Sequence, residues 1–127
     1  MRHLAEPGID LKVIQHRINK YLLQRDKPHR SAVGYRRKRS IADHAWAHAG
    51  AQTIITADIA DFFPSTRRYR VRQFWASHRY GTDPVTITLL TNLTTYRGSL
   101  PQGAPTSPVL SNLVNRDLDA RLSQLLA

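Results

Sequence analysis

The 127-residue sequence contains no cysteine, one methionine and nine acidic residues. The absence of cysteine excludes disulfide frameworks and thiolate metal sites, and it fits a reducing cytosol, so we expect a cytoplasmic protein. No apolar run approaches the roughly 20 residues that cross a bilayer, and the polar start of the chain is no signal peptide, so no membrane partner is expected. Hydrophobic residues still make up 41% of the chain, enough for the core of one small domain.

The scarcity of acids leaves a net charge of +10 that is unevenly distributed. Residues 1–79 hold 16 basic and 6 acidic side chains, whereas residues 80–127 hold three of each. Arginine outnumbers lysine by 15 to 4, and its guanidinium fork matches phosphate oxygens. A basic surface can simply be a solvated face, but this pattern favours contact with nucleic acid.

Hydrophobic periodicity and breaker residues predict four helices. They are expected over residues 10–25 with Asp10 as N-cap, from Ser40 toward Gly50 with Asp43 completing an imperfect capping box, after Ser65 as far as Gly81, and from Ser107 to the last residue. In the third helix Phe74 and Trp75 are expected in the core.

The segments between these helices are expected to be loops and one strand. Residues 26–39 and 96–106 are rich in turn residues and predict loops, the first of them strongly basic. Residues 53–59 are β-branched and mostly apolar, which predicts a short buried strand. Residues 84–95 follow a capping Asp83 but are rich in threonine, so helix and strand both stay open there.

Asp58 and Asp61 form the sharpest local feature, at the end of the expected strand, and two phenylalanines follow them. A buried strand would fix the backbone while a carboxylate at its end reaches the open edge, a suitable place for a divalent cation. For an isolated pair of this kind, an Asp that caps the next helix is the better interpretation.

The second feature is the stretch GSLPQGAPTSP over residues 98–108. Its two glycines and three prolines permit close backbone approach to a ligand, and it leads into a helix N-terminus, a natural anion site. Gln102 would be held rigidly between Pro101 and Gly103. Taken alone, the stretch is equally a turn followed by a helix cap.

In this order, DIADFFPS and GSLPQGAPTSPVLSNL resemble the reverse transcriptase family, in its bacterial retron and group II intron types. Upstream, Arg2, Pro7, LKVIQHRINKYLL and AVGYRRKRSI before AWAH are similar to that family's fingers segment. The resemblance covers nearly the whole chain. It implies an α+β fold, a partial fingers and palm with helices packed on a small antiparallel sheet. Residues 1–52 would be fingers-like and residues 53–127 palm-like.

The resemblance also implies roles for the residues that follow the expected strand. Asp58 is similar to the first metal-binding aspartate of the palm, with the Ile59 carbonyl as a further ligand. Asp61 and Phe62 would lie near the triphosphate of the incoming nucleotide through their backbone. Phe63 is similar to the aromatic residue that excludes a 2′-hydroxyl.

Further roles fall on the glycine and proline loop and on basic residues. Gln102 matches the family glutamine beside the incoming nucleotide, and Gly103 the glycine that allows close approach to the template–primer. Arg2 sits where a fingers arginine grips the triphosphate. Contact with the RNA backbone is expected from three arginines of the basic loop, Arg36, Arg37 and Arg39.

The family completes its site with a Tyr-x-Asp-Asp turn, and none of the nine acids here forms an Asp-Asp pair. Two-metal phosphoryl transfer needs such bridging carboxylates. The implied function is therefore RNA-directed DNA synthesis on a primer 3′-hydroxyl, using an RNA template, dNTPs and Mg²⁺ or Mn²⁺. The chain would stop before that turn and be inactive without it, and a second polypeptide could carry the turn and a thumb. The alternative is a non-catalytic nucleic-acid-binding remnant or one subunit of a split enzyme.

Two other chemistries are less well supported. His44 and His48 are four residues apart on a helix, a spacing that zinc can use, but no third ligand is evident, so a structural or nucleic-acid-facing pair is favoured. The serines near the two motifs lack an obvious histidine partner, which disfavours a nucleophilic hydrolase.

Overall fold

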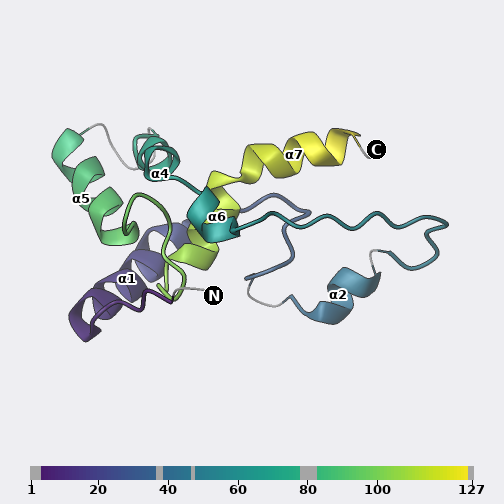
Figure 1. The fold of residues 1–127 in the computed structure, drawn as a ribbon, viewed down its shortest axis with the longest axis horizontal. Coiled ribbons are helices and arrows are strands. Elements are labelled where there is room, and N and C mark those ends of the chain that lie inside the picture. The colour runs from purple at the N-terminus through teal and green to yellow at the C-terminus, as the bar shows by residue number, and fades with distance from the viewer. Residues whose placement is uncertain (1–3, 37–38, 47, 78–82, 126–127) are drawn as a thin grey trace.

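The computed structural model describes residues 4–36, 39–46, 48–77 and 83–125 (Figure 1). Within these ranges the regular elements are helical: α1 (Ile9–Tyr21), the short 3-10 helix η1 (Leu23–Arg25), α2 (Ile41–Trp46), α3 (Phe62–Ser65), α4 (Arg68–Trp75), α5 (Pro84–Thr94), α6 (Ser107–Val114) and α7 (Arg116–Leu125). Helices α1, α4, α5 and α6 gather together, whereas α2 and the extended segment before α3 reach out to the other side (Figure 1). None of the described helices is long and apolar enough to span a membrane.

One hydrophobic core unites the early and late parts of the chain. Its buried members are Ile18, Leu23, Val71, Trp75, Ile87, Leu100, Leu110 and Leu113. The core prediction for Phe74 and Trp75 is confirmed, because Trp75 is fully buried and half-buried Phe74 packs against the same cluster. The indole Nε1 of Trp75 donates a hydrogen bond to Thr94 Oγ1 at 3.2 Å, which satisfies its buried polar group.

The small antiparallel sheet is not supported. Residues 53–59 are extended, but in the described part of the chain pairing is limited to isolated bridges from Ser99 to Arg67 and to Tyr96. A strand needs a neighbour to satisfy its N–H and C=O groups, so β-branched residues alone make no sheet. The segment is also not buried, since the side chain of Ile55 is 82% exposed.

Residues 84–95, which the sequence left open, form the helix α5. The Asp83 carboxylate accepts hydrogen bonds from the backbone N–H groups of Val85 and Thr86, and Pro84 occupies the first turn. The hydroxyls of Thr91 and Thr94 donate to carbonyl oxygens one turn earlier, each at 2.7 Å. This arrangement satisfies the threonine hydroxyls inside a helix, and the cap decides between the two structures.

The first two predicted helices form with altered boundaries. Helix α1 begins at Ile9 after Gly8 instead of after Asp10, and its inner face includes buried Gln15, whose side-chain amide donates to Leu93 O at 2.8 Å. Helix α2 is confirmed with its capping box: Asp43 Oδ2 accepts from Ser40 N at 2.7 Å.

The last two predicted helices differ more. Helix α4 ends at Trp75, and the predicted end at Gly81 lies outside the described residues. The single helix predicted from Ser107 to the end is wrong, because the chain breaks at Asn115 into α6 and α7. The half-buried guanidinium of Arg70, on α4, donates to Asn115 Oδ1 at 2.8 Å and to Val114 O at 3.1 Å. These bonds from another helix hold the break in place.

Candidate active site

The segment from Asp58 to Phe63 passes from extended chain into one helical turn. Asp61 takes a left-handed conformation, with φ 49° and ψ 49°, at the N-cap of α3, but its side chain makes no capping hydrogen bond. Its carbonyl oxygen accepts from Ser65 N at 2.7 Å. Both carboxylates, Asp58 and Asp61, are exposed. The side chain of Asp61 therefore does not act as a helix cap, and it remains available to a ligand.

Phe63 is anchored by aromatic neighbours, whereas Asp58 is not anchored. The ring of Phe63 lies 5.6 Å from that of Phe62 and 6.2 Å from that of Tyr35, measured between centroids, and it packs against the hydrophobic core. Tyr35 has a positive φ of 57°, which is unusual for a residue with a side chain. Nothing in the sequence indicated that Tyr35 meets Phe63.

A cavity of about 480 Å³ lies beside the same segment. Ile59 and Phe62 line one side of it, and α6 and α7 contribute Asn112 and Asp119. Partial burial raises the pKa of the Asp119 carboxyl, while the positive charge of His29 works in the opposite direction. The cavity beside the extended segment is therefore lined by both apolar and polar side chains.

The glycine and proline loop is tied to the end of α3. Leu100 N donates to Thr66 O at 3.1 Å, and Arg68 N donates to Gly98 O at 2.9 Å. These bonds bring the loop close to Phe63, three residues before Thr66. The two sequence motifs, about forty residues apart, therefore meet in space.

The close approach that Gly103 permits is to the chain's own N-terminal segment. Gly103 has a φ of +112°, and a Cβ there would lie 3.3 Å from Leu4 Cδ2. Ala5 N donates to the carbonyl oxygen of half-buried Gln102 at 2.8 Å. The backbone of Gln102 is thereby fixed, and residues 4–8 line a cavity of about 710 Å³ together with Gln102.

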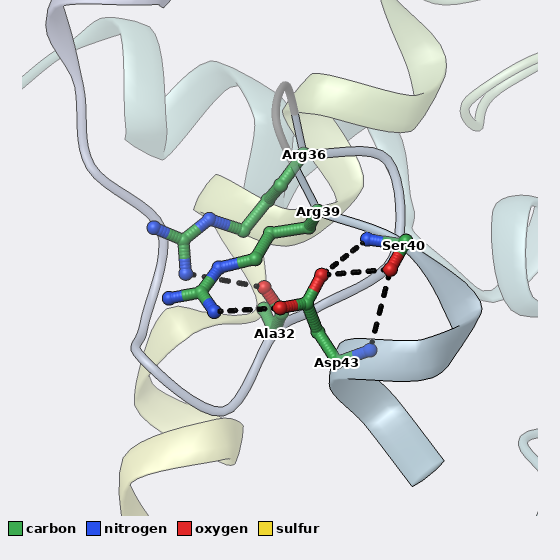
Figure 2. Close-up of polar contacts among 5 residues, drawn as sticks. All are labelled: Ala32, Arg36, Arg39, Ser40 and Asp43. Carbon is green, nitrogen blue, oxygen red and sulfur yellow. Dashed lines mark hydrogen bonds and ion pairs between the residues drawn. The ribbon is translucent and has the colours of Figure 1, made fainter. Parts of the chain in front are cut away.

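Two arginines of the basic loop contact groups four residues away in the chain (Figure 2). Arg36 donates to Ala32 O at 3.5 Å, and Arg39 lies 3.6 Å from Asp43 Oδ1. Hydrogen bonds from Ser40 and the nearby Arg39 charge hold the pKa of the Asp43 carboxyl below its usual range. Arg2 and Arg37 lie outside the described residues.

A complete metal site is not formed by the described residues. Among them, no three histidine, aspartate or glutamate side chains gather closely enough to hold a metal ion. The rings of His44 and His48 lie 5.0 Å apart, edge to face, on the exposed side of α2 and the turn after it. Asp58 offers one carboxylate and no more, so any ion there needs ligands from beyond this set.

Comparison with known proteins gives the same family along the whole chain. Residues 1–126 match the family described as Reverse transcriptase (RNA-dependent DNA polymerase). The chain is 34% identical to Retron Ec86 reverse transcriptase of Escherichia coli over 122 residues, which cover 96% of this chain and 38% of that protein. It is 35% identical to Retron Mx162 reverse transcriptase of Myxococcus xanthus, covering 98% of this chain and 29% of the relative.

A third relative, Retron Ec73 reverse transcriptase of Escherichia coli, is 31% identical over 139 residues, or 99% of this chain and 43% of the relative. The chain therefore spans 29–43% of the length of these three relatives. With the two motifs joined in space and the match running from residue 1 to residue 126, the chain belongs to the reverse transcriptase family.

Proposed function

We propose that this chain provides the fingers and the first part of the palm of an RNA-directed DNA polymerase. In the reaction, the primer 3′-hydroxyl would attack the α-phosphate of a dNTP paired to an RNA template, and pyrophosphate would leave. The observation that carries the proposal is the junction of the two motifs, through the hydrogen bonds Leu100 N to Thr66 O and Arg68 N to Gly98 O. It brings the loop that contains Gln102 to the aromatic residues that follow Asp58.

The proposed roles on the nucleotide side follow the motif around α3. Asp58 would be one carboxylate ligand of a divalent cation, Mg²⁺ or Mn²⁺, with the Ile59 carbonyl as a further ligand. Asp61 and Phe62 would lie near the triphosphate, and Phe63 would fill the space that a 2′-hydroxyl needs. The support for Phe63 is its fixed position between Phe62 and Tyr35.

Other residues would contact the nucleotide and the template–primer. Gln102 would lie beside the incoming nucleotide, and Arg2 would grip its triphosphate. Gly103 and the arginines of the basic loop, Arg36, Arg37 and Arg39, would contact the template–primer. The backbone of Gln102, held by Ala5, supports a rigid placement of this loop.

The missing carboxylates would come from a Tyr-x-Asp-Asp segment outside these 127 residues, either in a longer form of the protein or in a second polypeptide. The support is the state of residues 53–59, which are extended, β-branched and exposed. A hairpin that pairs with this segment would satisfy its backbone groups and bring two carboxylates beside Asp58. The chain alone would then show no polymerase activity.

The test uses this chain together with the segment that carries the Tyr-x-Asp-Asp turn, on a primed RNA template with Mg²⁺ and dNTPs. We expect no extension by the chain alone and extension by the combination. Asp58→Asn should nearly abolish extension, because a neutral amide is a far poorer ligand for Mg²⁺. Phe63→Ala should leave synthesis partly intact while admitting ribonucleotides.

Asp10→Asn, an exposed change of the same kind on α1, is the matched control and should leave extension unchanged. If both Asp58→Asn and Phe63→Ala leave rate and sugar selectivity unaltered, the assigned roles are wrong. The second candidate function, a non-catalytic nucleic-acid-binding protein, is supported by the net charge of +10, which needs no metal site to attract a polyanion. This second function would be supported if the combination binds template–primer and never extends the primer.

A further inference from the structure

The start of α4 is strongly basic, and none of the roles above uses it. Four arginines lie within residues 67–72, with no acid among them. Arg70 is turned to the interior, where it holds the break at Asn115. Arg67, Arg68 and Arg72 are exposed. These three side chains are therefore accessible from solvent.

A tight turn places one more arginine and a tyrosine next to these residues. Ser99 forms isolated bridges with both Arg67 and Tyr96, so the 96–99 turn lies against the start of α4. Tyr96 is 52% exposed, and the guanidinium carbon of Arg97 lies 5.3 Å from the centre of its ring. We call the set of Arg67, Arg68, Arg72, Tyr96 and Arg97 the α4 basic surface.

Two arginines of this surface are held by hydrogen bonds, and among the described residues no ion pair neutralises any of its charges. Arg68 donates to Thr95 Oγ1 at 3.0 Å and to the side-chain oxygen of Asn92, and Arg72 donates to Thr88 Oγ1 at 3.2 Å. All three acceptors are neutral groups on or next to α5. The ion pairs Lys12–Glu6 and Arg39–Asp43 lie elsewhere in the chain. Four positive charges on so small an area attract a polyanion.

We propose that the α4 basic surface binds single-stranded nucleic acid, through residues that have no assigned role in the Asp58 and Phe63 site. The arginine forks would contact successive phosphates, and the exposed Tyr96 ring would stack on an unpaired base. The surface adjoins that site, because Arg67 follows Phe63 by four residues and Arg68 N donates to Gly98 O at 2.9 Å. A strand bound here would therefore lie next to the proposed catalytic site.

Binding is measured on the purified chain by the fluorescence anisotropy of labelled 12-nucleotide oligo(U) and oligo(dT) over a series of salt concentrations. The variant Arg67→Gln/Arg72→Gln/Arg97→Gln removes three charges and spares Arg68, which makes two side-chain hydrogen bonds where Arg72 makes one. The control Arg17→Gln/Arg116→Gln/Arg121→Gln removes three exposed charges elsewhere. Circular dichroism of each variant checks that the helices are retained.

We expect the surface variant to lower affinity about tenfold or more at low salt. The slope of log affinity against log salt should also fall by about 2, because each phosphate that the protein neutralises on a single strand contributes about 0.7 to it. The control should change affinity less than about threefold. An equal loss in both variants, or a loss confined to Arg36→Ala/Arg37→Ala/Arg39→Ala, overturns the proposal. The proposal is also overturned if the chain binds anionic lipid vesicles and neither oligonucleotide.

Base stacking is tested with an abasic phosphodiester strand of the same length. The chain should bind oligo(dT) about fivefold or more tightly than the abasic strand, and Tyr96→Leu should remove most of that preference. The control is Tyr69→Leu, which changes an exposed tyrosine on α4 and should keep the preference. If the chain binds both strands equally, the stacking role of Tyr96 is wrong. Binding needs no Tyr-x-Asp-Asp segment, so its failure is distinguishable from failure of the polymerase proposal.

Discussion

The two tryptophans of the chain lie in contrasting regions. Trp75 is fully buried in the helical core, which α1, α4, α5 and α6 form with the 96–106 loop, and its N–H is bonded. Trp46 is 77% exposed on α2, in the arm formed by residues 39–61. In the described part of the arm every side chain is exposed except half-buried Asp43. Both regions contain residues that normally form interiors, so the presence of a partner, not residue type, decides burial here.

The arm exposes large apolar side chains of the kind that the core buries. Ile41, Trp46, Ile54 and Ile55 are all more than half exposed. The core is therefore expected to determine the stability of the chain, and the arm is expected to contribute only when a partner is bound.

The largest expected difference comes from truncating each tryptophan. Trp75→Ala should lower the free energy of unfolding by about 3–5 kcal/mol, because it leaves a cavity in the core. Trp46→Ala, the matched change in the arm, should alter it by less than about 0.5 kcal/mol. Urea unfolding followed by circular dichroism measures both values. Equal losses would show that the arm packs as tightly as the core.

A smaller contrast is expected from replacing an apolar β-branched side chain by threonine in each region. Val71→Thr should destabilise the chain by about 1–3 kcal/mol, because a polar hydroxyl replaces a methyl group that packs in the core, even where that hydroxyl donates to the carbonyl oxygen one turn earlier. Ile55→Thr should have almost no effect, since that side chain is 82% exposed. The midpoint of urea unfolding at constant slope gives both numbers. A large loss for Ile55→Thr would mean that the arm is buried in solution.

The smallest expected effect concerns the cap of α5. Hydrogen bonds from Thr86 and Val85 hold the pKa of the Asp83 carboxyl below its usual range. A lowered folded-state pKa stabilises the fold above the unfolded pKa of about 3.9, and this contribution is lost as pH falls through the folded value. Asp83→Asn should therefore reduce the loss of thermal stability between about pH 5 and pH 2. Asp117→Asn, measured by the same thermal melts, is the control, and equal pH profiles for Asp83→Asn and the wild type would contradict the assignment.

The sequence predicted what depends on neighbours along the chain and missed what depends on distant ones. The capping pairs Ser40–Asp43 and Asp83–Thr86 are local, and the first of them was predicted with its helix. The break at Asn115 depends on Arg70 from another helix, so periodicity in the last segment could not reveal it. The expected sheet is not found for the same reason, because the sequence of one strand does not show which segment pairs with it.

For the candidate site too, the sequence predicted the local features and missed the contacts between distant residues. The residue types and their order around Asp58 and Gln102 were sufficient to recognise the family. Their junction through Thr66 and Leu100, and the contact of Tyr35 with Phe63, exist only in three dimensions. The charges of the α4 basic surface were visible in the sequence, but the 96–99 turn that completes this surface could not be placed beside α4 without the structure.

The distant partners of α1 have a consequence for synthesis on the ribosome. Gln15 bonds to Leu93 and Asn19 to Pro105, 78 and 86 residues later in the chain. At about 5–20 residues per second, α1 must wait roughly 4–20 s after its own synthesis before these partners exist. A 13-residue helix is marginal in water. The N-terminal part of the nascent chain therefore stays largely unfolded, and open to chaperones and proteases, until the glycine and proline loop has emerged.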